Sequence, residues 1–242
     1  MELVYHDNDI VVINKPPGMW PEQGLFDEPG VLDLLQKKEG IEATGLNCLY
    51  SLEQSVSGLM LWTRNEGTQK SLEQQFNEKR LNVVFLALVR TAFPAEDGVI
   101  DRPLRKTQGG NQRLHIDEDR GTKAVTEWHL RDRYVGFALL ECRPLTSIAQ
   151  QVRAHLEFAE MPLAVDPLYG GAEYLKLSSF KAGYRPSRRR PERPLIQRPT
   201  LHLQSISFKH PNTGDELHFE ASFPKDFRAT LHQLDRFGRV PK

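Results

Sequence analysis

Apolar residues in the first third of this chain gather in short runs, which predict strands separated by turns. The runs Leu3–Tyr5 and Ile10–Asn14 flank a cluster of turn-forming residues and predict two strands joined by a tight turn. The runs Leu59–Trp62 and Val83–Val89 are continuously apolar, which is typical of buried strands. This part of the chain is therefore expected to supply several strands, two of them in the core.

Three segments carry the signals of helix starts and ends. Proline and glycine precede Val31, where helical apolar spacing begins, and the predicted helix ends at Gly40. Asn65 is expected to cap the start of a polar helix that runs to Glu78. Near the end of the chain, Pro224–Phe237 has the pattern of a closing amphipathic helix. Helices are thus predicted between strands rather than in a separate block.

Two pairs of strands are predicted later in the chain. Apolar and polar residues alternate loosely over Thr122–Arg133 and Gly136–Pro144, which predicts antiparallel strands. The tail offers Leu201–Lys209 and Glu216–Ala221 as a strand and its partner. Arg185–Pro199 has neither a helical nor a strand period, so we expect an extended surface loop there.

The stretch Pro144–Leu156 predicts a further helix, whose apolar spacing continues to Ala159. Four apolar residues recur in it at helical spacing and form one face: Ile148, Val152, Leu156 and Ala159. This spacing puts Arg153 on the flank of the apolar face and directs Gln150 and Gln151 away from it. By pattern alone, an arginine on such a flank is expected to be solvated.

Length and composition favour one soluble domain. With 242 residues and 39% apolar residues, the chain can build one sizeable core or two small lobes, and we expect a single catalytic domain over residues 1–242. It contains neither an apolar run of membrane-spanning length nor an N-terminal secretion signal, which predicts a cytoplasmic protein without a membrane partner. Cys48 and Cys142 are too few for a disulfide framework and are predicted to be buried thiols.

Charge is balanced overall but unevenly distributed. The 32 basic residues equal the 32 acidic ones, so bulk charge does not indicate nucleic-acid binding. However, residues 1–50 hold nine acids against three lysines, whereas residues 181–198 hold six arginines, one lysine and one glutamate. We predict that any phosphate contacts lie in the later segment, at Arg188, Arg189, Arg190 and Arg193. The alternative is a solvated loop.

Glu53 is the acid whose position is most suggestive of chemistry. It lies in a loop of small residues just before the buried run Leu59–Trp62, where a carboxylate is either a reagent or a simple loop acid. The chain has no Gly-x-Ser-x-Gly elbow, no phosphate loop and no dinucleotide-binding fingerprint. Its eight histidines show no metal-binding spacing, so neither a metal nor a cofactor is expected.

The sequence around Glu53 resembles the signature of the RluA-like pseudouridine synthases. That signature is His-Arg-Leu-Asp-x-x-Thr-Ser-Gly-Leu, and Leu52, Ser57, Gly58 and Leu59 match it. Four positions differ, because the His, Arg, Asp and Thr of the pattern are replaced here by Tyr50, Ser51, Glu53 and Val56.

Other segments resemble the same family in the same order, from residue 3 to about residue 234. Lys15–Gly18 closely resembles the family's Lys-Pro-x-Gly motif, and Val165–Gly171 is nearly a full match to its Gly-Asp-x-x-Tyr-Gly segment. The helical pattern Thr-Gly-Arg-x-His-Gln-Ile-Arg-x-His-Leu is retained at Thr146, Gln151, Arg153, His155 and Leu156, whereas Ser147, Ile148 and Gln150 replace its Gly, Arg and His.

The resemblance implies an α+β fold, with a curved mixed or antiparallel sheet, flanking helices and a central cleft. It implies isomerisation of uridine to pseudouridine in structured RNA, ribosomal or transfer, by a monomer without cofactor or metal. The implied roles are the catalytic acid for Glu53, its partner for Arg153 and a base-stacking ring for Phe85. Lys15 and Gln151 join the arginines as predicted RNA contacts. Because Lys15 comes so early, no RNA-binding module is expected before the catalytic domain.

Two departures from the family leave the activity open. Glu53 replaces the family aspartate, and Phe85 replaces a tyrosine in the pattern Lys-x-Tyr-x-Ala-Leu-Val. An extra methylene moves a carboxylate by about 1 Å, and misplacement of that order can cost about 100-fold in rate. One alternative is a catalytically inactive RNA-binding or ribosome-assembly factor of the same fold. Another is a protein-interaction module that uses the acidic N-terminal part.

Overall fold

The computed structural model describes residues 1–21, 29–42, 44–91, 95–107, 113–185 and 191–240. The chain divides into two compact units. Unit 1 consists of Met1–Val84, Leu145–Ala149 and His202–Ser222, and unit 2 consists of Phe85–Pro144, Gln150–Leu201 and Phe223–Lys242. Among the described residues, no helix is both long enough and apolar enough to span a membrane.

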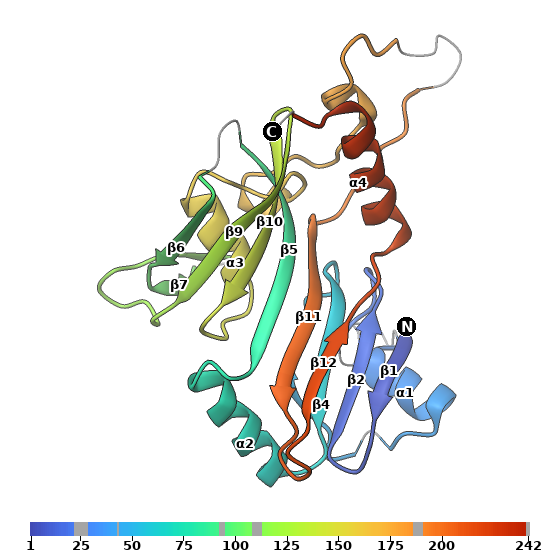
Figure 1. The fold of residues 1–242 in the computed structure, drawn as a ribbon, viewed down its shortest axis with the longest axis vertical. Helices are drawn as coiled ribbons and strands as arrows, with labels where there is room; N and C mark the ends of the chain where they lie inside the picture. Colours follow the sequence, from blue (N-terminus) through green and yellow to red (C-terminus); the bar gives the residue numbers. More distant parts are fainter. Residues whose placement is uncertain (22–28, 43, 92–94, 108–112, 186–190, 241–242) are drawn as a thin grey trace. The chain divides into compact units, whose positions relative to one another are not determined.

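Unit 1 is built on the strand order β1-β2-β4-β11, with β3 also paired to β4 and β12 to β11 (Figure 1). Its strands are β1 (Glu2–His6), β2 (Ile10–Lys15), β3 (Asn47–Tyr50), β4 (Ser57–Thr63), β11 (Leu201–Lys209) and β12 (Glu216–Glu220). The β4/β11 pair is parallel, whereas β1/β2 and β2/β4 are antiparallel. Two helices, α1 (Val31–Glu39) and α2 (Glu66–Asn77), belong to this unit.

Several local predictions for unit 1 are confirmed. Every residue of β4 is buried, as its continuous apolar run predicts. α1 ends at Gly40, whose φ of 67° is the left-handed conformation that glycine adopts without a steric cost. Asn65 caps α2, since its side-chain oxygen accepts a hydrogen bond from the Thr68 N–H at 2.8 Å. These features depend on neighbours in sequence, which explains why pattern reasoning finds them.

Unit 2 has the strand order β5-β10-β9-β6, all antiparallel where the register is defined, and a separate β7-β8 hairpin (Figure 1). Its strands are β5 (Asn82–Arg90, which begins in unit 1), β6 (Asp97–Asp101), β7 (Leu104–Lys106), β8 (Leu114–Ile116), β9 (Val125–Tyr134) and β10 (Phe137–Pro144). The helices are α3 (Gln151–Phe158) and α4 (Lys225–Phe237), with two short 3-10 turns at Pro167–Tyr169 and Leu177–Ser179.

The core of unit 2 joins its strands to residues 164–196 and to α4. It contains buried residues from β5, β9, β10, the 164–196 region and α4: Leu86, Leu88, Tyr134, Phe137, Leu139, Ala164, Val165, Leu175, Phe180, Ile196, Phe227 and Leu234. α3 contacts β8, β9 and β10, so the helix is fixed on this strand layer. Packing against these strands of unit 2 therefore fixes the orientation of the α3 residues.

The structure corrects the predicted start of the helix around Arg153. α3 begins at Gln151 rather than near Ile148, because Gln150 adopts a left-handed φ of 70°. The predicted orientation is wrong for Gln151, which was expected to point away from the apolar face but is only 2% exposed. It is also wrong for Arg153, which was expected on a solvated flank but is 5% exposed. Strands β3, β6, β7 and β8 were not predicted; β7 and β8, with three residues each, are too short to show a period.

Candidate active site

Glu53 lies in the loop between β3 and β4 of unit 1. Leu52 and Val56, on either side of it, are 3% and 2% exposed and anchor the loop in the core, while Glu53 itself is half-buried. The Val56 N–H donates to the Glu53 carbonyl at 3.1 Å and closes a tight turn. The backbone of the predicted acid is therefore held firmly on both sides.

Lys15, at the end of β2, holds the neighbouring residue of this loop. Its ammonium donates hydrogen bonds to the carbonyls of Gln54 at 3.0 Å, Met19 at 3.0 Å and Pro16 at 3.2 Å. The Gln54 carbonyl also accepts the Gly18 N–H at 2.8 Å. Because Lys15 is 0% exposed, its charge acts on the Glu53 loop and is not presented to solvent as an RNA contact would require.

Gly58 explains why the Ser-Gly-Leu sequence suits the start of β4. The parallel partner β11 passes so close that a Cβ on Gly58 would lie 2.3 Å from the Leu203 carbonyl oxygen. The preceding Ser57 hydroxyl lies 3.0 Å from Nδ1 of His202 in a fully buried pair. This pair joins β4 to β11, and its burial shields the Ser57 hydroxyl from any substrate.

Arg153 forms a buried ion pair in unit 2. Its Nε and Nη2 each donate to one carboxylate oxygen of Asp166 at 2.7 Å. The two side chains are 5% and 0% exposed, so the solvated arginine expected from pattern alone is wrong. A planar fork that binds a carboxylate with two parallel bonds has little rotational freedom, so the guanidinium is fixed in orientation.

Asp166 is brought to Arg153 by a compact turn over Val165–Gly171. The carbonyl of Asp166 accepts the N–H groups of Tyr169 at 3.1 Å and Gly171 at 2.8 Å. Gly170 has a φ of 75°, and a Cβ on Gly171 would lie 2.4 Å from the Leu163 carbonyl oxygen. The two glycines therefore permit a turn that side chains would block.

Gln151 and His155 fasten α3 to β9. Gln151 Nε2 donates to the Thr126 hydroxyl at 3.0 Å and to the Val125 carbonyl at 2.9 Å. Thr126 Oγ1 lies 2.8 Å from His155 Nδ1, and His155 Nε2 lies 2.9 Å from the Arg102 carbonyl, which only accepts. Nε2 therefore carries the proton. Burial lowers the pKa of His155, so the ring is neutral, and Gln151 serves the helix instead of facing solvent.

Phe85 lies in β5, where it pairs in register with Cys142 of β10. It is 4% exposed, so its ring is part of the packed protein. Burial raises the pKa of the Cys142 thiol, which agrees with the prediction of a buried, unreactive thiol at this position. Cys48, in contrast, is only half-buried.

The predicted site residues are distributed over the two units. Glu53 and Lys15 belong to unit 1, and the structure brings the Lys15 ammonium to the Glu53 loop. Phe85, Gln151 and Arg153 belong to unit 2, with the last two on α3. The pairing of Glu53 with Arg153 stays a prediction.

The arginines of residues 181–198 differ in their surroundings. Arg193 is exposed, and Arg188, Arg189 and Arg190 lie outside the described residues. Arg198, by contrast, forms two hydrogen bonds to Asp226 of α4, at 2.7 and 2.9 Å. Burial alone would raise the pKa of the Asp226 carboxyl, but the Arg198 hydrogen bonds and charge outweigh it and lower that pKa.

Asp7, Asp9 and His210 form the one group of possible metal ligands among the described residues. His210 Nδ1 accepts the N–H groups of Asn212 and Thr213 at 3.3 and 3.1 Å, so the ring proton is on Nε2, which lies 3.0 Å from Asp7 Oδ2. An Nε2–H that donates to a carboxylate has no lone pair for a metal. The cluster is therefore best described as a hydrogen-bonded clamp between two turns of unit 1.

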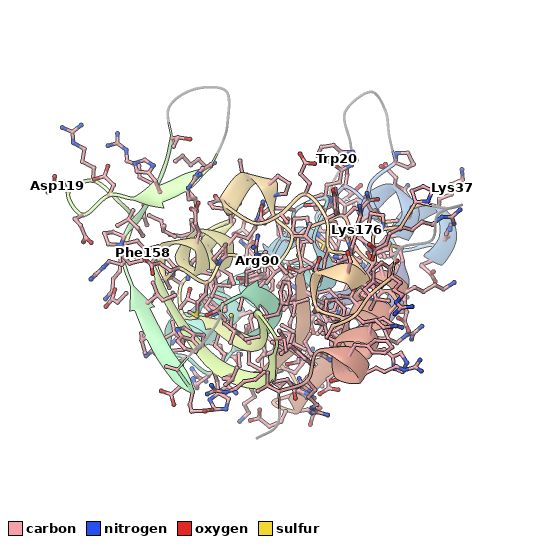
Figure 2. All side chains as sticks on the ribbon, turned by 90° about the horizontal axis from the view of Figure 1, so that it is seen from above. Trp20, Lys37, Arg90, Asp119, Phe158 and Lys176 are labelled. Atoms are coloured by element: carbon pink, nitrogen blue, oxygen red, sulfur yellow. The ribbon has the colours of Figure 1, made fainter. Side chains whose placement is uncertain are left out.

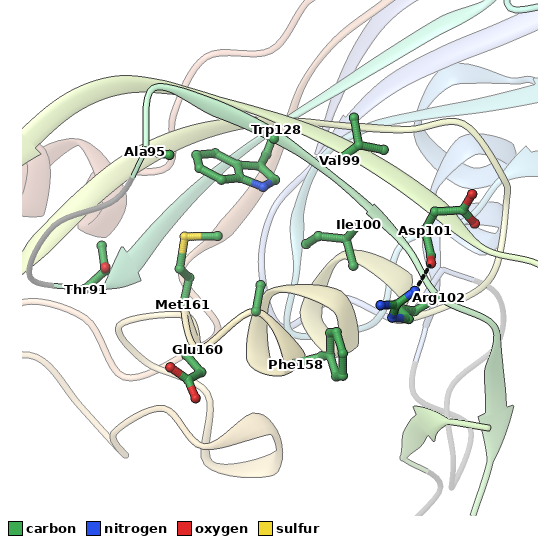
Figure 3. Close-up of a pocket in the computed structure, with 12 residues that line it drawn as sticks. Thr91, Ala95, Val99, Ile100, Asp101, Arg102, Trp128, Phe158, Glu160 and Met161 are labelled. Atoms are coloured by element: carbon green, nitrogen blue, oxygen red, sulfur yellow. Dashed lines mark hydrogen bonds between the residues drawn. The ribbon is translucent and has the colours of Figure 1, made fainter. Parts of the chain in front are cut away.

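A cavity of about 620 Å³ lies in unit 2 between β6 and the end of α3 (Figure 3). Ile100, Trp128 and Met161 line its apolar part, and Arg102 donates to the Asp101 carbonyl at 3.2 Å on its rim. Phe158, which is labelled in Figure 2 and is 49% exposed, also lines the cavity. None of the predicted catalytic residues lines this cavity.

Sequence reasoning missed two residues that contact Arg153, namely Asp166 and Tyr169. The Arg153 guanidinium carbon lies 4.8 Å from the centroid of the Tyr169 ring. The signal was present, because both residues occur in the segment that matches the family's Gly-Asp-x-x-Tyr-Gly. A short sequence match does not show which residues its members contact. Their contacts with Arg153 could therefore be found only in the folded chain.

Comparison with known proteins gives consistent results. A sequence model of the RNA pseudouridylate synthase family matches residues 9–158. An uncharacterized RNA pseudouridine synthase of Bacillus subtilis is 27% identical over 244 residues, which cover 98% of this chain and 74% of that protein. The ribosomal large subunit pseudouridine synthase C of Salmonella typhi is 29% identical over 235 residues, which cover 96% of this chain and 69% of that protein.

Solved structures show the same fold. The human protein RNA pseudouridylate synthase domain containing 4 superposes with a TM-score of 0.68 at 20% identity, covering 100% of this chain and 95% of that one. Human RNA pseudouridylate synthase domain containing 1 gives a TM-score of 0.64 at 19% identity, covering 92% and 83%. Together with the mixed strand pairing, these likenesses confirm the expected α+β fold.

Proposed function

Because this chain belongs to the RNA pseudouridylate synthase family, we propose that it converts uridine to pseudouridine in a structured RNA, ribosomal or transfer. The observation that carries the proposal is the family match over residues 9–158, which includes Glu53, Phe85 and Arg153. RNA is thus the expected partner.

The reaction breaks the bond between ribose C1′ and uracil N1, turns the base and joins C1′ to C5. C5 loses a proton and N1 gains one, so atoms and electrons balance without a redox partner. We assign Glu53 as the acid that acts at the ribose, Arg153 as the cation that keeps it ionised, and Phe85 as the ring on which the detached base stacks. The target nucleotide must also leave its helix to reach such a group.

The contacts of unit 1 support the role of Glu53. Lys15 and Gly18 both bind the Gln54 carbonyl, at 3.0 and 2.8 Å, so the residue next to Glu53 is fixed from two sides. A fixed backbone removes one source of displacement of the Glu53 carboxylate, and a reagent must be placed accurately. Arg188–Arg190 and the exposed Arg193 are proposed to bind phosphates.

Pseudouridine mapping in cells tests the activity. RNA from a strain that lacks the gene should lose one or more pseudouridines, and the purified protein should restore them. Glu53→Gln keeps the shape of the side chain but removes its charge, and we expect at least a 100-fold loss of rate. Glu53→Asp, which has the family residue, should retain activity. Glu66→Gln, an exposed acid of α2, is the matched control and should behave like the wild type.

The inactive RNA-binding factor predicts a different outcome. In that case the deletion strain keeps the wild-type pseudouridine map, and RNA affinity is the same for the wild type and Glu53→Gln. Binding should still weaken steeply with salt, and replacing Arg188, Arg189, Arg190 and Arg193 by alanine should reduce the salt slope by about one per lost phosphate contact.

A further inference from the structure

Tyr169 occupies a central position among the polar groups around α3. The side chain is 0% exposed. Its ring centroid lies 4.8 Å from the guanidinium carbon of Arg153 and 5.2 Å from that of Arg113. At such distances the negative face of an aromatic ring attracts a cation, and the effect grows when the pair is buried.

The hydroxyl of Tyr169 makes two further short contacts. It donates to Gln150 Oε1 at 2.6 Å, and it accepts the backbone N–H of Leu114 in β8 at 2.7 Å. Arg113, the residue before Leu114, donates to the Leu168 carbonyl at 3.3 Å and forms an ion pair with Glu157 of α3. Through Tyr169 and Arg113, the β7-β8 hairpin is thus attached to α3.

Gln150 shows what the hydroxyl contact stabilises. This residue has a φ of 70°, a left-handed conformation that is unfavourable for a non-glycine residue and persists only where surrounding contacts enforce it. Gln150 immediately precedes α3, so its backbone sets where the helix begins. Arg153 lies three residues later, and its position depends on that start.

The ion pair with Asp166 fixes only one edge of the Arg153 guanidinium. Asp166 binds the edge of the guanidinium formed by Nε and Nη2, at 2.7 Å each. In a planar guanidinium, Nη1 then points away from that carboxylate. Any further group that Nη1 binds therefore lies on the side opposite Asp166. A tilt of the plane moves Nη1 most, because it lies farthest from the anchored edge.

We propose that Tyr169 is a positioning residue for the reaction, which fixes the guanidinium plane of Arg153 with its ring and the start of α3 with its hydroxyl. The inference rests on the proposed function, in which Arg153 keeps the catalytic carboxylate ionised. Tyr169 itself does not touch substrate, and its effect reaches the reaction through the placement of Arg153.

Two substitutions separate the ring from the hydroxyl. Tyr169→Phe keeps the ring and loses both hydroxyl contacts, and we expect kcat to fall about 10-fold. Tyr169→Leu also loses the ring, and kcat should fall about 100-fold, the scale of a 1 Å misplacement. In both variants KM should stay within about twofold, because substrate contacts are unchanged. Phe208→Leu, which removes an equally buried ring from unit 1, should keep the wild-type kcat below its melting temperature.

An NMR measurement keeps the inference testable if Tyr169→Leu does not fold. The Nε–H signal of Arg153, assigned by its loss in Arg153→Lys, should exchange slowly with solvent in the wild type and at least 10-fold faster in Tyr169→Phe. A folded Tyr169→Leu with kcat within twofold of the wild type would overturn the proposal, as would unchanged exchange in Tyr169→Phe. If the wild type makes no pseudouridine, the proposed function fails, while the exchange rates still decide the role of Tyr169.

Discussion

Lys15 in unit 1 and Arg153 in unit 2 are both buried cations, at 0% and 5% exposure, yet their observed partners differ in kind. Lys15 binds three backbone carbonyls, which are dipoles, whereas Arg153 binds a full negative charge on Asp166. Carbonyls are part of the backbone, so by binding three of them Lys15 fixes the shape of a loop. The carboxylate of Asp166 is part of a side chain, so its contact with Arg153 fixes the direction of that arginine.

The largest effect is expected from breaking the ion pair on one side. Asp166→Leu leaves the Arg153 guanidinium buried without its carboxylate, and the free energy of unfolding should fall by about 3–5 kcal/mol. Urea denaturation of the wild type and the variant gives this difference.

The double variant Arg153→Met/Asp166→Leu is the matching control. Replacing both charges by apolar side chains removes the cost of burying either, so this variant should be more stable than Asp166→Leu alone. The two side chains are not coupled if the double variant loses as much unfolding free energy as Asp166→Leu and Arg153→Met together. In that case the contrast with Lys15 is lost.

A smaller effect is expected from Lys15→Met. The loss of hydrogen bonds from a charged donor to several carbonyls should lower the free energy of unfolding by about 2 kcal/mol. The cost should be smaller than for Asp166→Leu, because the three carbonyls that bind Lys15 are uncharged and can bind water once the loop opens. Limited proteolysis should show faster cleavage at residues 51–56.

Lys37→Met tests whether burial is the cause. Lys37 is an exposed lysine in the last turn of α1 in the same unit, and its loss should change stability by less than about 0.5 kcal/mol. Equal effects of the two lysine substitutions would contradict the role given to Lys15.

The smallest effect concerns how the stability of the protein depends on pH through His155 of α3. Burial lowers the pKa of His155, so the unfolded chain binds a proton near pH 6.5 that the folded protein does not bind. This part of the stability is therefore complete above that pH and declines as the pH falls below it. His155→Gln should show a flatter dependence over this range in urea denaturation. A slope equal to that of the wild type would assign the acid sensitivity to other groups.

The sequence predicted those features of the fold whose cause lies within a few residues. The apolar run at β4, the Asn65 cap of α2 and the Gly40 end of α1 each follow from local pattern. The start of α3 could not be predicted in this way, because nothing in the local pattern signals the left-handed conformation of Gln150, whose side chain accepts a hydrogen bond from the distant Tyr169. The same limit made Gln151 and Arg153 look solvated, although both are buried.

By itself, the sequence determined the family, the α+β class and the candidate catalytic residues, because the order of the motifs and the apolar periodicity can be read directly from it. Only the tertiary structure decided what these residues do to one another. It showed that Lys15, a predicted RNA contact, binds the backbone of the Glu53 loop, and that Arg153 has two neighbours, Asp166 and Tyr169. The physical reason is that a buried charge needs partners within hydrogen-bond reach, and those partners can come from any part of the sequence.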